Sequence, residues 1–229
     1  MRLTPEVIRD APVYLNPIEQ RELSLRGKDI VVIENLGVAK DVHECIDMCN
    51  NQIVKLENFP IMKRLETLMM SGNKIVTIAP GLGKSLPNLH TLLLENNQIR
   101  TVSDIESISE LSSSLTHLTI SSNPIVEMIS NLRPILIALL PKLKVIDYVR
   151  VTQAEQELGA SIRNRLMSGT PLDSVVILTS LKPVKVKLTG AQKKQLLKKL
   201  DAASTLAEME VLEGILQTGI VPVDFDWDS

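Results

Sequence analysis

The histidines and cysteines of this chain could serve in catalysis or metal binding, but their spacing does not favour either role. The three histidines, His43, His90 and His117, fall at different positions of the pattern described below, so they point in different directions. Cys45 and Cys49 are four residues apart, which on a strand is about 13 Å. That distance exceeds the roughly 7 Å limit for a disulfide. We therefore expect two reduced thiols, as in a nuclear or cytosolic protein.

Patterns typical of enzymes are missing from the sequence. It has no glycine-rich phosphate loop, no C-x-x-C pair and no Ser/His/Asp set whose members can be placed together. The sequence therefore predicts a non-enzymatic protein that needs no cofactor or metal.

Four asparagines recur at intervals of roughly 22–26 residues, and their amides have a structural use. An amide both donates and accepts hydrogen bonds, so each can satisfy main-chain groups where the chain leaves a strand. We expect a structural ladder of Asn51, Asn73, Asn97 and Asn123. One interval earlier stands Lys28, whose ammonium group can only donate, but terminal repeats are commonly atypical.

The asparagines belong to the template L-x-x-L-x-L-x-x-N-x-I, which runs from Leu89 to Ile99 in its clearest copy. Leu92 and Leu94 alternate with Leu93 and Glu95, the period of a strand with one buried face. Five copies, the first degenerate, predict an α/β fold: a leucine-rich repeat solenoid with a parallel concave sheet. A single repeat cannot bury its own apolar face, so neighbouring repeats must cover one another.

Both ends of the array carry capping signals. Thr4 followed by Pro5 predicts the start of a helix that covers the first repeat. The apolar run 135–140 suits a helical turn on the last repeat, and Leu143, Ile146 and Tyr148 then echo a final strand.

The chain after the array changes in composition. Gln153 to Met167 is compatible with a polar helix, and a capping box at Thr205 and Glu208 predicts a helix over 206–218. Seven lysines between Lys182 and Leu200 precede a stretch with seven acids and no base. We expect four regions: an N-terminal cap (1–19), the repeat domain with its C-terminal cap (20–150), a linker with a polar helix (151–189), and a C-terminal helical region with an acidic tail (190–229).

The composition limits the possible locations and partners of the protein. Its 229 residues are 44% hydrophobic but only 2% aromatic, so the core is expected to be aliphatic. The sequence has no apolar run of 18 residues and no signal-peptide pattern, so we expect no contact with a membrane. The net charge of −2 does not indicate any class of partner.

The strand residues that alternate with the core form the expected binding surface. Exposed apolar side chains such as Met69 and Leu93, rimmed by polar ones, are typical of protein-binding surfaces. A curved parallel sheet can hold an amphipathic helix in its concave face. The predicted partner-binding residues are Cys45, Asp47, Thr67, Met69, Thr91, Leu93, Glu95, His117 and Thr119.

Three blocks make the chain resemble a known family: 21–30 (RELSLRGKDI), 32–37 (VIENLG) and 203–222 (ASTLAEMEVLEGILQTGIVP). Together with the repeat spacing, they resemble the A-prime subunit of the U2 small nuclear ribonucleoprotein. The resemblance covers nearly the whole chain except about 168–190, where an expected lysine-rich stretch is missing. It implies a nuclear, non-enzymatic spliceosomal subunit.

The resemblance also implies partners. In that family the repeat domain binds the RNA-recognition domain of the B-double-prime subunit through a helix in its concave face, and the pair binds U2 small nuclear RNA. Transferred here, it implies RNA contacts by Arg21, Arg26 and Lys28, and we expect 190–229 to contact other spliceosomal proteins. The alternative is a leucine-rich repeat regulator of a protein phosphatase. A pull-down separates these two functions.

Overall fold

The computed structural model describes residues 1–129, 131–168, 184–185 and 220–221. The chain divides into two units, Met1–Leu178 and Thr179–Ser229. In the second unit, β11 (Val184–Lys185) pairs antiparallel with β12 (Ile220–Val221). The helix predicted over 206–218 and the acidic tail after it lie outside the described residues.

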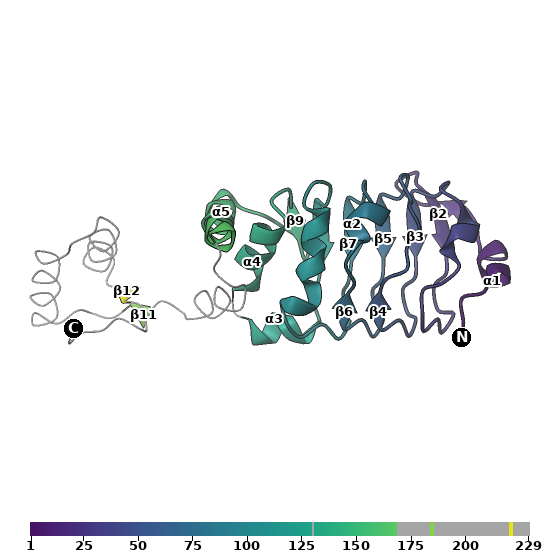
Figure 1. The fold of residues 1–229 in the computed structure, drawn as a ribbon, viewed down its shortest axis with the longest axis horizontal. Coiled ribbons are helices and arrows are strands. Elements are labelled where there is room, and N and C mark those ends of the chain that lie inside the picture. Colours follow the sequence, from purple (N-terminus) through teal and green to yellow (C-terminus); the bar gives the residue numbers. More distant parts are fainter. Residues whose placement is uncertain (130, 169–183, 186–219, 222–229) are drawn as a thin grey trace, which may run out of the picture. The chain divides into compact units, whose positions relative to one another are not determined.

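The first unit is built on one sheet of eight strands, in the order β1-β2-β3-β5-β7-β8-β9-β10 (Figure 1). Its parallel part consists of β2 (Arg21–Ser24), β3 (Cys45–Asp47), β5 (Thr67–Met69), β7 (Thr91–Leu93), β8 (His117–Thr119) and β9 (Val145–Ile146). Neighbouring strands align the same template position, as in the row Ile46, Leu68, Leu92 and Leu118. The predicted repeat register is therefore confirmed.

The core lies between this sheet and a series of short elements. These are η1 (Leu36–Ala39), α2 (Leu82–Ser85), η2 (Ser103–Leu111), α3 (Pro124–Met128) and a second small sheet of β4 (Lys55–Leu56) and β6 (Thr77–Ile78). The buried side chains are almost all Leu, Ile and Met, each contributing about 1.5–3 kcal/mol. Their continuous stacking explains why a chain with so few aromatic residues can fold.

The N-terminal cap contains the expected helix and an unexpected strand. Helix α1 (Pro5–Arg9) begins where predicted, and Thr4 Oγ1 accepts a hydrogen bond from Val7 N at 3.5 Å. Strand β1 (Val13–Leu15) then pairs antiparallel with β2. Three residues are too few to show a periodic pattern, so the sequence did not predict this strand. It covers one edge of the parallel sheet.

The C-terminal cap consists of α4 (Leu132–Leu139), the hairpin of β9 with β10 (Val149–Arg150), and α5 (Gln153–Met167). Helix α5 has the predicted bounds and begins with a capping box of Thr152 and Glu155. The expected final strand ends earlier than predicted, because Tyr148 lies in the turn between β9 and β10 and is 72% exposed.

Helix α5 packs against α4. Ile162 is buried in this contact, and Arg133 on α4 donates to Glu155 Oε1 at 2.7 Å and to Ile146 O at 3.0 Å. The hydrogen bond from Arg133 is the main reason that the pKa of Glu155 falls to about 2. We propose that the folded repeat domain includes α5, which the sequence had assigned to the linker.

Candidate protein-binding face of the sheet

The sheet has a face turned away from the core, which we call the outer face. It is formed by the strand residues that alternate with the core residues and by the residues that follow each strand. One row across it contains Glu22, Cys45, Thr67, Thr91 and His117, and the next contains Ser24, Asp47, Met69, Leu93 and Thr119. All nine predicted partner-binding residues lie on this face.

The accessible part of the outer face lies over its central strands and β8. Met69 and Leu93 are neighbours on β5 and β7, and both are half-buried. Thr91 and Glu95 are also half-buried, and His117 is exposed. Two adjacent apolar side chains with polar groups around them fit a protein-binding surface.

Four of the predicted partner-binding residues are buried, which corrects the expectation that the whole strip is accessible. Cys45, Asp47, Thr67 and Thr119 are 0%, 2%, 7% and 5% exposed. Cys45 contacts Glu22 and Asp47 contacts Arg26. Alternation along a strand predicts the face on which a side chain lies but not how much of it is exposed.

Glu22 is the centre of a buried polar network near the β1 edge. Its carboxylate accepts hydrogen bonds from Tyr14 OH at 2.7 Å, from Asn16 Nδ2 at 3.2 Å and from Cys45 Sγ at 3.5 Å. Burial, together with the charge of Glu22, raises the pKa of the Cys45 thiol well above its usual value. Cys45 therefore stays protonated and acts as a hydrogen-bond donor within the fold. The pKa of Cys49 is raised as well, to about 12, mainly by burial.

The predicted RNA-contact residues do not form one basic patch. Arg21 begins β2, whereas Arg26 lies beyond its other end, roughly 16 Å along the strand direction. Arg26 donates to the buried Asp47 Oδ2 at 2.6 Å, so its charge is already balanced. Lys28 lies at the Arg26 end and is half-buried.

The four asparagines form the expected ladder. Asn97 illustrates it: its Nδ2 donates to Met70 O and Leu94 O, both at 3.0 Å, and its Oδ1 accepts from Ile75 N at 3.0 Å. Equivalent bonds are made by Asn51, Asn73 and Asn123. Each amide thus connects its own turn to the preceding repeat.

Two residues of the C-terminal hairpin complete the face, and sequence reasoning missed both roles. Asp147 Oδ1 accepts hydrogen bonds from Ile120 N at 2.7 Å and from Ser121 N at 2.8 Å, closing the last repeat. Tyr148 OH donates to Glu95 Oε2 at 3.1 Å. The only sequence signal for either role was the presence of an aromatic residue after Asp147, in a chain with five aromatic residues.

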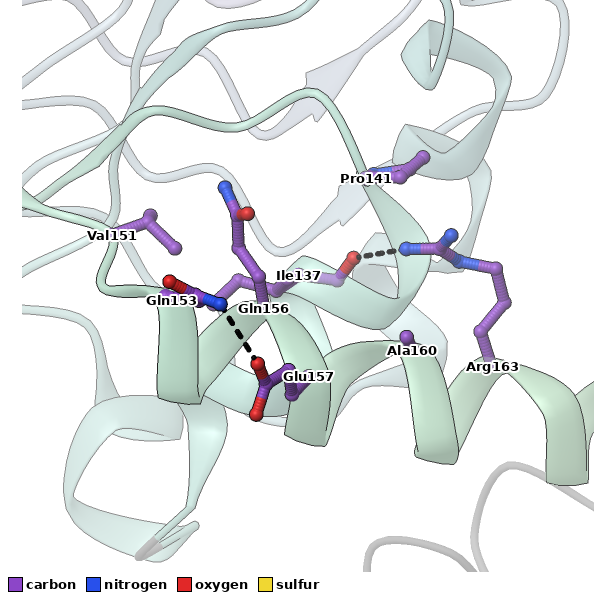
Figure 2. A pocket seen from close by; sticks show the side chains of 8 residues that line it. All are labelled: Ile137, Pro141, Val151, Gln153, Gln156, Glu157, Ala160 and Arg163. Carbon is purple, nitrogen blue, oxygen red and sulfur yellow. Dashed lines mark hydrogen bonds between the residues drawn. The ribbon is translucent and has the colours of Figure 1, made fainter.

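The described residues also contain a groove beside α5 (Figure 2). Three of its polar side chains contact one another or the main chain: Arg163 donates to Ile137 O at 3.1 Å and to Ala138 O at 2.9 Å, and Gln153 donates to Glu157 at 3.1 Å. No group of His, Cys, Asp and Glu in the described part of the chain is arranged to hold a metal ion. None of the described helices is long and apolar enough to cross a membrane.

The fold and the asparagine ladder define a leucine-rich repeat protein. The leucine-rich repeat family profile matches residues 1–169. A U2 small nuclear ribonucleoprotein A′ of Schizosaccharomyces pombe is 33% identical over 97% of this chain and 100% of its own length. The human U2 small nuclear ribonucleoprotein A′ is 35% identical over 97% of this chain and 90% of its own length.

A solved structure agrees with these relatives. The crystal structure of the Drosophila melanogaster SNF/U2A′ complex contains a chain that is 31% identical, with a TM-score of 0.68, over 74% of this chain and 99% of that one. The chain belongs to the U2 small nuclear ribonucleoprotein A′ family. This membership confirms the expected non-enzymatic repeat scaffold.

Proposed function

We propose that this protein is a nuclear subunit of the U2 small nuclear ribonucleoprotein whose outer face binds the RNA-recognition domain of the B-double-prime subunit. In this proposal an amphipathic helix of the partner lies on Met69 and Leu93, and the two proteins together bind U2 small nuclear RNA. The observation that carries the proposal is the adjacent, half-buried pair of apolar side chains on the outer face, with the polar residues Thr91 and Glu95 beside them.

Two further observations support this proposal. The solved Drosophila relative is described as a complex of U2A′ with SNF, the counterpart of the B-double-prime protein. Glu95 places a half-buried carboxylate beside Leu93 on the outer face, so a basic side chain on the partner helix would be complementary to it. The family favours this function over regulation of a phosphatase.

Contact with RNA remains a narrower part of the proposal. Arg21 and Lys28 have no carboxylate partner among the described ion pairs, whereas Arg26 is paired with Asp47. We therefore assign any contact of this chain with RNA phosphates to Arg21 and Lys28 rather than to Arg26, whose charge is balanced by the carboxylate of Asp47.

Leu93→Glu tests the proposed interface. A charge placed where an apolar side chain meets the partner should raise the Kd for the B-double-prime RNA-recognition domain at least tenfold, about 1.4 kcal/mol. Leu93 is only half-buried, so the variant should remain folded, which circular dichroism will check. Val76→Glu, on an exposed valine outside the outer face, is the matched control and should bind normally. Normal binding by Leu93→Glu would place the interface elsewhere.

The region 190–229 is proposed to contact other spliceosomal proteins. Truncation after Thr170 retains α5, so the shortened chain should still form the RNA-bound heterodimer while it enters larger spliceosomal assemblies less efficiently. Gel filtration of the heterodimer and co-purification from nuclear extract measure the two effects. Loss of the heterodimer would assign the C-terminal region to the first interface instead.

A further inference from the structure

The two tyrosines of the chain stand at opposite ends of the outer face. Tyr14 lies on β1 and donates to Glu22 Oε1 at 2.7 Å, and Tyr148 lies beyond β9 and donates to Glu95 Oε2 at 3.1 Å. In each case a carboxylate of the sheet holds the hydroxyl. The side chain of Tyr148 must extend from the β9–β10 turn past β8 to reach Glu95, which follows β7.

Tyr148 has a backbone conformation that its own side chain disfavours. Its φ is 65° and that of Asp147 is 48°, so both residues of the turn are left-handed. Two-residue turns of this kind prefer Asn-Gly or Asp-Gly, and an aromatic residue at positive φ is an outlier. The turn is held in place by the bonds from Ile120 N and Ser121 N to Asp147. Local stability would therefore be better served by glycine or asparagine at position 148.

The two anchored hydroxyls leave room for a helix between them. Glu22 lies on β2 and Glu95 follows β7, three strand positions apart, which is about 14 Å across the sheet at roughly 4.8 Å per step. Glu22 is in the row of Thr91, so Glu95 is also displaced from it by four residues, about 13 Å along the strands. An α-helix with its side chains is about 10–12 Å wide. Met69 and Leu93 belong to β5 and β7, within this span. The pair Met69 and Leu93 thus lies within the part of the face that the two anchored hydroxyls span.

We propose that Tyr148 is a partner-contacting residue: its ring forms the C-terminal wall of the outer face and packs against the amphipathic helix of the RNA-recognition domain. This inference rests on the proposed function, and it specifies an aromatic contact beyond the strands themselves. Tyrosine suits the role because it offers a large, rigid contact surface and is enriched among residues that dominate binding energy. The strained turn is then retained for binding, since folding alone does not require it.

Tyr148→Asn separates a binding role from a structural one. Asparagine tolerates positive φ, so the Tm of the full-length variant should equal or exceed that of the parent. Its Kd for the B-double-prime RNA-recognition domain should rise at least tenfold. Tyr148→Phe keeps the ring and should bind within about threefold of the parent. Met167→Asn, at a residue that is 78% exposed on α5, is the matched control and should change neither value.

Each contrary result has a separate meaning. Normal binding by Tyr148→Asn, with binding lost by Leu93→Glu, would overturn the role of Tyr148 and leave the proposed function standing. A lower Tm for Tyr148→Asn would make the tyrosine structural and overturn the inference. Normal binding by both Leu93→Glu and Tyr148→Asn would refute the proposed interface, and the inference would fail with it.

Discussion

Asn97→Ala is expected to lower the free energy of unfolding by about 3 kcal/mol. The Asn97 side chain is 1% exposed, and its amide serves four main-chain groups in two repeats: Ile75 N, Met70 O, Leu94 O and Glu95 O. Alanine can replace none of these bonds. The site is enclosed, so the loss falls on buried donors and acceptors, which cost about 1–3 kcal/mol when left unpaired.

Urea unfolding followed by circular dichroism measures this loss as a lower midpoint. The matched control is Gln98→Ala, because the adjacent Gln98 side chain is exposed, and it should change the unfolding free energy by less than about 0.5 kcal/mol. A loss in Asn97→Ala no larger than that of the control would mean that the ladder does not hold the repeats together.

The ladder could be predicted from sequence because the repeat is translational. Each asparagine stands at the same template position, and parallel neighbours bring equal positions into register, as Leu68 and Leu92 show. The bonds of one repeat then follow from those of the next. The bounds of α5 could be predicted for a different reason: Thr152 and Glu155 form a local capping box.

The residues of the outer face could be predicted from sequence, but which of them are accessible could not. Alternation assigns Asp47 and Thr119 to the correct face, but it does not predict that both are buried. Asp47 is satisfied by Arg26, which is distant in sequence. Tyr148 was assigned to a strand because it continues the spacing of Leu143 and Ile146, whereas the turn is fixed by bonds from Ile120 and Ser121 to Asp147. Such long-range contacts leave no local pattern.

In the contact between α4 and α5, the role of a glycine likewise could not be predicted from the sequence. Gly159 lies inside a helix, where glycine is usually unfavourable by about 1 kcal/mol relative to alanine. In the structure it is buried against α4: a Cβ atom built at Gly159 would lie 2.6 Å from Ile137 Cγ2 and 2.9 Å from Ile137 Cβ. The glycine therefore allows the two helices to approach, a role visible only once both are in place.

Gly159→Leu is expected to destabilise the C-terminal cap by about 2–3 kcal/mol, because the helices must separate to admit the new side chain. Ile162, buried in the same contact, would then be exposed. Helix α5 is at the end of the unit, so it should open locally while the central strands stay folded. Hydrogen–deuterium exchange should show lost protection in 153–167 and unchanged protection around Leu68 and Leu92. The matched control, Ala154→Leu on the exposed side of α5, should keep its protection. Equal protection in the two leucine variants would refute the close packing of α5 on α4.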